Sequence, residues 1–310
     1  KMADTVVIAH KNMQEVRIGA TKGQVPEIVY NRRPKTAEGS VRMAFTLEPE
    51  VIATQKVKHG PDGSVQVTFD YKYEETQLDF GPIDAGVCVL RVEDVNGGIV
   101  GSLINFGCHP VCIYPYLSTA ISADYPAYAT GVVEQVEGGI CLFTLGLAGN
   151  TVPVRRGVKP RQQIGKALGA EALKRLQLVT TTGSVTLKGL KREIEFATKK
   201  EADPNVTEAD DKTKDYVTTE IQVLRLGDIY ILGLPGEVLV EVGLEIKKRA
   251  GLENLFIVTV SNDTIGEVCH SGAYEEGGYE PGTGTNLAKG AGEIMTEKAI
   301  ELINQIKRSR

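Results

Sequence analysis

The stretch "AGVCVLRVEDVNGGIVGSLINFGCHP", residues 85–110, has the pattern of two paired β-strands. Two apolar runs with several β-branched residues flank an Asn96-Gly97 pair, a dipeptide that tight hairpin turns prefer. The second run ends at His109 and Pro110. The stretch therefore predicts a β-hairpin whose second strand delivers a lone histidine to the end of a sheet.

Strand-like and helix-like patterns alternate over the rest of the chain. The apolar spacing predicts helices over 125–135, 161–178, 238–250 and 286–306, with apolar strands between them. This alternation predicts an α/β (or α+β) fold in which mixed β-sheet layers are covered by helices. No internal repeat is visible in the sequence.

The length of 310 residues allows one large domain. We expect a single domain over 1–310, with two lobes, about 1–180 and 181–310, as the alternative subdivision. The charged stretch 197–216 is too polar to bury, so we interpret it as a surface loop.

Composition excludes some classes of protein. Lys and Arg number 35 against 40 Asp and Glu, a net charge of −5, so we expect no nucleic-acid partner. No apolar run reaches the roughly 18 residues that span a bilayer, so we expect no transmembrane segment. The oligomeric state stays open.

Cysteine usage and the first residues bear on location. The five cysteines form no C-x-x-C pair, and we expect them to be buried and reduced. The segment "KMADTVVIAHKNMQEVRIG" lacks the pattern of a signal peptide and resembles the interior of a domain. We therefore expect a piece of a longer, soluble protein, with a cytoplasmic location favoured over a secreted one.

Three apolar strands end in residues whose side chains bind metals. "SLINFGCHP" ends at His109, and "IYILGLPGE" ends at Glu237. "LFIVTVSND" ends at Asn262 and Asp263, before a glycine-rich loop that holds Tyr279. Ligands gather beyond the carboxyl ends of strands in open sheets, so we expect these segments to converge.

Each of these residues also has a purely structural interpretation. His109 beside a proline is consistent with a hydrogen-bonded structural histidine. Glu237 follows Pro-Gly and would complement a helix dipole. Tyr279 in a glycine-rich loop is typical of a packing anchor.

Several motifs together resemble the neutral/alkaline (non-lysosomal) ceramidases and their shorter bacterial relatives. The similar segments are "VYNRRP", the paired strands ending in His-Pro, "ISADYPAYA", "LGLAGNTVP", "LPGEVLVEVG" and "GGYEPGTG", in the same order over nearly the whole chain. The resemblance implies a hydrolase-like catalytic domain, truncated at its start, that cleaves the amide of an N-acyl substrate with a bound zinc ion.

By this resemblance the zinc ligands are His109, Glu237 and Tyr279, a donor set that zinc accepts. Arg32 resembles the arginine that stabilises the oxyanion. From spacing alone, we expect Asp124 to accept the second ring N–H of His109. The partner implied is a small-molecule or lipid-like amide.

The chain departs from the family pattern at three places. The family's first zinc histidine lies upstream in a segment that has no counterpart here, so one protein ligand is missing. Asn150 and Val152 replace an aspartate and a serine of the family loop. Glu267 stands where the family commonly has tyrosine.

Two alternatives to a zinc amide hydrolase stay open, and the departures favour the first of them. The first is a catalytically silent relative that binds a ligand in the same cleft. The second is a serine hydrolase built on Ser122, Asp124 and His109, although Ser122 has no nucleophile-elbow setting.

Overall fold

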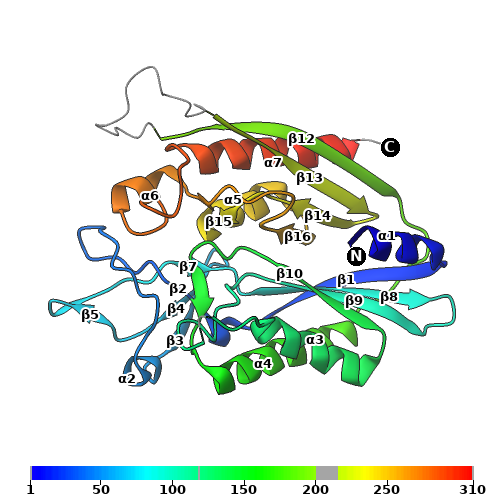
Figure 1. The fold of residues 1–310 in the computed structure, drawn as a ribbon, viewed down its shortest axis with the longest axis horizontal. Helices are drawn as coiled ribbons and strands as arrows, with labels where there is room; N and C mark the ends of the chain where they lie inside the picture. Colours follow the sequence, from blue (N-terminus) through cyan, green and yellow to red (C-terminus); the bar gives the residue numbers. More distant parts are fainter. Residues whose placement is uncertain (1, 118, 200–215, 309–310) are drawn as a thin grey trace.

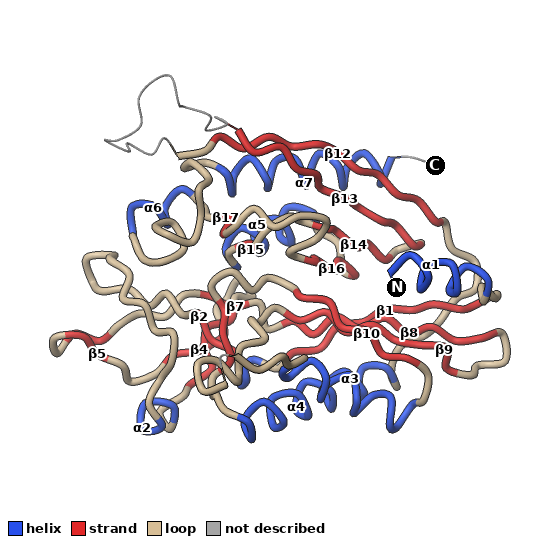
Figure 2. Tube along the Cα trace, in the orientation of Figure 1, coloured by secondary structure: helices blue, strands red, loops and turns tan. Residues whose placement is uncertain are grey.

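The computed structural model describes residues 2–117, 119–199 and 216–308. Two four-stranded sheets pack against each other, and helices cover the other face of each sheet (Figure 1). Figure 2 shows α3 and α4 below the strands of the first sheet, and α7 alongside β12 and β13 at the top of the view. The expected fold class, mixed sheet layers covered by helices, is confirmed.

The first sheet has the order β1-β8-β9-β10. The first two pairings are antiparallel, and β9 and β10 are parallel. A parallel pair needs a crossover, which α3 supplies, and α4 packs beside α3. The bounds are β1 (Val16–Gln24), β8 (Gly86–Asp94), β9 (Ile99–Phe106), α3 (Asp124–Glu137), β10 (Ile140–Leu145) and α4 (Val158–Leu176).

The second sheet repeats this arrangement. Its order is β12-β13-β14-β16, again with two antiparallel pairings followed by one parallel pairing. Helix α5 connects the parallel strands, and α7 follows the last one. The bounds are β12 (Leu187–Ala197), β13 (Tyr216–Leu226), β14 (Ile229–Gly233), α5 (Val240–Ala250), β16 (Asn254–Val258) and α7 (Ala291–Arg308).

The two halves therefore share a topology that the sequence did not reveal. Apolar patterning records which residues face a core, and many different residues satisfy the same pattern. A repeat of strand order without a repeat of residues leaves no periodic signal. The division into two lobes stays a prediction.

Three apolar clusters hold the layers together. One joins the first sheet to α3 and α4, and another joins the second sheet to α5 and α7. The third lies between the sheets and includes Ile18 and Cys88 from the first sheet and Ile229 and Phe256 from the second. All five cysteines are free and buried, as expected.

Shorter elements surround this framework. Residues 63–79 alternate apolar and polar side chains as one half-exposed strand would, but they form three short strands, because Glu74 and Glu75 have φ values of 47° and 63° and turn the chain there. The remaining elements are α1 (Met2–Lys11), η1 (Pro26–Ile28), β2 (Val29–Asn31), α2 (Pro49–Ile52), β3 (Lys56–His59), β4 (Val65–Thr68), β5 (Lys72–Tyr73), β6 (Thr76–Gln77), β7 (Pro82–Ile83), β11 (Thr151–Pro153), β15 (Glu237–Val238), β17 (Glu267–Val268) and α6 (Ser271–Glu276).

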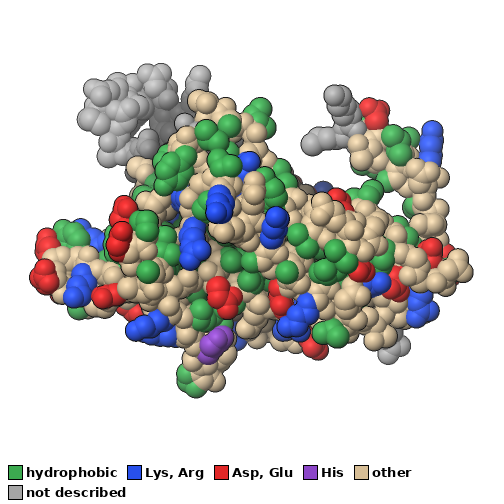
Figure 3. All heavy atoms as spheres, turned by 90° about the horizontal axis from the view of Figure 1, so that it is seen from below, with side chains coloured by type: hydrophobic (Ala, Val, Ile, Leu, Met, Phe, Trp, Pro, Cys, Tyr) green, Lys and Arg blue, Asp and Glu red, His purple; other side chains and the backbone are tan. Residues whose placement is uncertain are grey.

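The face of the molecule that α3 and α4 form carries side chains of mixed charge and polarity. Basic, acidic and hydrophobic side chains are interspersed there (Figure 3). Within the described ranges, no helix has the length and apolar character that crossing a membrane requires. Most of the predicted surface loop 197–216 lies outside the described residues.

The contact between the two halves at Gly149 generates a prediction. A Cβ atom there would lie 2.7–2.8 Å from backbone atoms of Glu237, Val238 and Leu239, which cannot move aside cheaply. Gly149→Ala should lower the free energy of unfolding by about 2–3 kcal/mol, the usual cost of overpacking, as measured by urea denaturation.

Gly131 in α3 provides the control, because a Cβ atom there meets nothing within 4 Å. Gly131→Ala should stabilise the chain by about 0.5–1 kcal/mol through helix propensity. Equal effects of the two substitutions would show that Gly149 is not a tight crossing point.

Candidate metal centre

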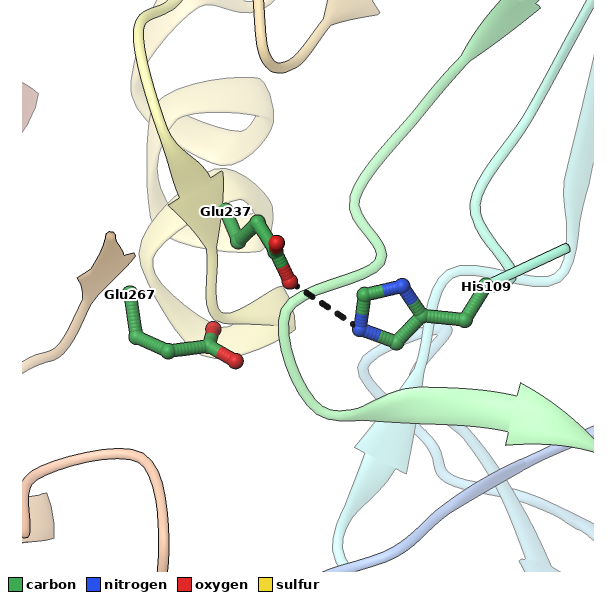
Figure 4. A group of neighbouring side chains, drawn as sticks. All are labelled: His109, Glu237 and Glu267. Carbon is green, nitrogen blue, oxygen red and sulfur yellow. Dashed lines mark ion pairs between the residues drawn. The ribbon is translucent and has the colours of Figure 1, made fainter. Parts of the chain in front are cut away.

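Three side chains from distant parts of the chain converge at one point. His109, Glu237 and Glu267 each offer one ligand atom, and these atoms all lie within 4.8 Å of one another (Figure 4). The Nε2 atom of His109 is 3.3 Å from an Oε2 atom of Glu237. One imidazole and two carboxylates at this spacing can hold a divalent cation.

The repeated topology explains the convergence of His109 and Glu237. His109 follows β9, the third strand of the first sheet, and Glu237 follows β14, the third strand of the second sheet. Both strands end where their parallel partners end, which is where open sheets place ligands. The backbone N–H of His109 donates to Thr151, which fixes its loop.

A short parallel ladder aligns the two carboxylates. Glu237 in β15 is the register partner of Glu267 in β17, so both side chains project from the same face. The loop before β17 also holds the turn before β15, because the Val260 N–H donates to Gly236. Val260 has a φ of 52°, a strained value for a β-branched residue.

Glu267 is buried with one oxygen unpartnered. Its Oε1 accepts a hydrogen bond from Arg32 at 3.1 Å, whereas its Oε2 has no hydrogen-bond partner among the described residues. Burial raises the pKa of Glu267 to about 9, and the nearby carboxylates Glu237 and Glu280 raise it further while Arg32 opposes the shift. A bound cation would give this oxygen the partner that it lacks.

His109 is held in the form that binds metals. Burial lowers the pKa of His109 to about 3, and Arg32 and Arg156 add to the effect, while the backbone carbonyl of Gly149 opposes it. The imidazole is therefore neutral at physiological pH, and a neutral ring nitrogen is the metal ligand. The donor set thus fits a divalent metal.

A buried ion network supports the carboxylate side of the site. Glu280 is fully buried and accepts from Arg32 at 2.8 Å and from Arg33 at 2.6 Å. Arg32 also donates to Glu267 and to the Gly149 carbonyl. Arg32 thus connects loops of the two halves at the point where the three candidate ligands meet.

Solved structures of similar fold were found, although no protein-family model and no curated protein matches the chain. The crystal structure of neutral ceramidase from Pseudomonas aeruginosa superposes with a TM-score of 0.70, covering 99% of this chain and 54% of that one at 16% identity. A ceramidase complexed with C2 gives a TM-score of 0.67, 96% and 55% coverage, and 16% identity.

The chain has the neutral ceramidase fold. It spans about half the length of the ceramidase chains that it matches. The likeness anticipated from the ordered motifs is therefore confirmed as a likeness of fold.

Within this ceramidase fold, His109 and Glu237 lie together as the sequence predicted. Glu267 completes the group, although in the sequence it stands out only as a departure from the family tyrosine. The sequence signal that could have identified Glu267 as a ligand is its place between apolar residues in "GEVC". A glutamate in such a segment is expected to be buried, and a buried glutamate needs a partner. Its two-residue strand is too short to predict.

Tyr279, a predicted zinc ligand, lies at the rim of the group and is 41% exposed. Its ring packs edge-on against Phe45 and lies under the Arg32 guanidinium. Burial and the carboxylates of Glu267 and Glu237 raise the pKa of the Tyr279 phenol, against the effect of Arg32. Metal ligation by Tyr279 stays a prediction.

Arg32 was predicted to stabilise an oxyanion, and the structure gives it a bracing role as well. Its Nε and one terminal nitrogen are occupied by Glu280, Glu267 and Gly149. Its guanidinium also lies against the rings of Phe45 and Tyr279. Contact with a substrate stays a prediction.

The predicted pairing of Asp124 with His109 is not what the structure shows. The Asp124 carboxylate accepts from the backbone N–H groups of Ile113 and Tyr125, so it closes the loop after His109. Ser122 accepts from the Asp124 N–H and from Arg161, not from His109. The serine-hydrolase alternative therefore has no support in the described contacts.

Asn150 and Val152, the other departures, have structural roles. Asn150 accepts from the Val240 N–H and donates to Glu241, which ties its loop to the start of α5. Val152 pairs with Tyr30 between β11 and β2 and is fully buried.

The unpartnered oxygen of Glu267 generates a prediction about zinc affinity. Glu267→Gln should weaken zinc binding by at least about 100-fold, more than the usual loss of an outer-shell partner. It should leave the metal-free unfolding midpoint close to wild type, because the raised pKa keeps Glu267 protonated at pH 7. Competition with a chromophoric chelator measures the affinity.

Glu276→Gln is the matched control, because Glu276 pairs with Arg33 and Lys35 in the same region outside the metal group. Its zinc affinity should stay within about threefold of wild type. Equal losses in the two variants would contradict the assignment of Glu267 as a ligand.

The pKa shifts also predict the pH dependence of metal binding. Glu267, with its pKa raised to about 9, must release a proton to bind a cation, whereas His109, with its pKa lowered to about 3, releases none above pH 5. Zinc affinity should therefore rise about tenfold per pH unit between pH 6 and 8. Calorimetry in buffers of different ionisation enthalpy counts the proton, and a count of zero would oppose this account.

Proposed function

We propose that the chain binds one zinc ion through His109, Glu237 and Glu267 and hydrolyses an N-acyl amide. The observation that carries the proposal is the convergence of these three residues at the strand ends of a ceramidase fold, where a buried Glu267 oxygen has no partner among the described residues. Zinc bound there would supply a Lewis acid and lower the pKa of water to about 7.

Residues around the zinc ion would then orient its ligands and contact the substrate. Arg32 orients Glu267 through a direct hydrogen bond and keeps positive charge beside the site. Glu237, whose side chain is 38% exposed, is the most solvent-accessible of the three ligands, so we infer that a substrate approaches beside it. Tyr279 keeps its proton, because its pKa is raised, and so offers a hydrogen-bond donor at the rim.

The substrate class is inferred from the neighbours. The solved structures of similar fold are ceramidases, so we infer a small or lipid-like amide as the substrate. The apolar rim made by Phe45 and Tyr279 supports an amide with an apolar chain.

A catalytically silent relative is the second candidate. Two observations favour it: Arg32 has most of its donors engaged, and Asn150 and Val152 are held in structural contacts. This candidate binds a ligand in the same cleft, and its ligand affinity would survive His109→Ala.

Hydrolysis of fluorogenic N-acyl amides with stoichiometric zinc tests the proposal. Wild type should turn over, and His109→Ala should fall to the zinc-free background because an imidazole ligand is lost. Glu276→Gln should retain activity. Stoichiometric zinc binding without turnover on short- or long-chain amides would favour the silent relative.

A further inference from the structure

The loop between β9 and α3 exposes a concentrated group of large apolar side chains. Tyr114, Tyr116, Leu117 and Ile121 are 57%, 66%, 44% and 105% exposed. Apolar residues scattered singly over a surface are ordinary, but a group within eight positions of one loop indicates an interaction site. We call these four residues the loop patch.

The backbone beneath the loop patch is braced. The Arg156 guanidinium donates to the carbonyls of Val111 and Tyr114, and also to the carbonyl of Phe45. The N–H of Gly157 donates to Cys112. The apolar side chains are therefore presented outward by a loop that is tied to the rest of the fold.

The loop patch continues toward the candidate metal centre. Phe45, which Arg156 joins to the loop, is 44% exposed and packs against the ring of Tyr279. Beside Tyr116 lies a hollow of about 530 Å³, whose walls include Leu47, Ile52 and Arg155. Exposed apolar side chains thus lie both on the loop and at the rim of the site.

Cationic side chains flank the loop patch, although the whole chain has a net charge of −5. Arg155 and Lys159 are exposed at the start of α4, and Arg161 donates to Ser122 at the end of the loop. Glu48 also lines the hollow beside Tyr116. Tyrosines with an apolar body and a polar tip, next to arginine and lysine, match the chemistry of a membrane interface.

We propose that the loop patch docks the chain on an anionic lipid surface. Ile121 and Leu117 enter the acyl boundary, the two tyrosines lie at the headgroup level, and Arg155 and Lys159 contact anionic headgroups. The charge of these two residues selects a lipid surface over an apolar protein face. The proposal stands apart from the metal centre and its chemistry.

Co-sedimentation with vesicles, in the presence of a metal chelator, tests the proposal without any readout of activity. One set of vesicles is phosphatidylcholine alone, and in the other about one lipid in five is phosphatidylglycerol. Wild type should bind the vesicles that contain phosphatidylglycerol at least about tenfold more tightly than it binds the phosphatidylcholine vesicles. The double variant Leu117→Asp, Ile121→Asp should bind the phosphatidylglycerol vesicles at least about tenfold more weakly than wild type.

Leu187→Asp is the matched control, because Leu187 is 74% exposed on β12 in the other half. It should bind vesicles as wild type does. Arg155→Glu with Lys159→Glu should remove the preference for anionic lipid.

The proposal is overturned if wild type does not sediment, or if the loop variant binds like wild type. Self-association that the loop variant loses, without vesicle binding, would assign the loop patch to a second copy of the chain and also overturn it.

Discussion

A fully buried carboxylate, Glu280, joins the parts of the candidate site. It accepts from Arg32 and Arg33, and Arg32 extends from there to Glu267. Because removing one partner of a buried ion pair costs about 3–5 kcal/mol, this network fixes the position of Arg32 strongly. The orientation of Glu267, and with it the candidate metal group, depends on that position.

The repeated sheet topology supplies the rest of the geometry. Each half places a parallel strand pair so that its carboxyl end meets that of the other half, and apolar packing between Ile18, Cys88, Ile229 and Phe256 holds the sheets in contact. His109 and Glu237 are then brought together by position in the fold, although they lie 128 positions apart in the sequence. The chemistry of the site is a consequence of two similar packed layers whose parallel strand pairs end at the same place.

Sequence patterning predicted the parts of this arrangement that depend on local physics. The Asn96-Gly97 hairpin, the long helices and the strand ends at His109 and Glu237 follow from turn chemistry and apolar periodicity. The role of Glu267 could not be predicted, because a two-residue strand has no periodicity. That role also depends on the register that pairs Glu267 with Glu237. Asp124 was misassigned because spacing cannot say which way a carboxylate faces, and here it faces Ile113.

Anomalous diffraction at the zinc edge, from crystals grown with equimolar zinc, tests the central claim most directly. The account predicts one strong anomalous peak between the His109 imidazole and the carboxylates of Glu237 and Glu267, at about 2.0–2.2 Å from a ligand atom of each. A peak elsewhere, or none at this group in crystals that contain zinc, would contradict it.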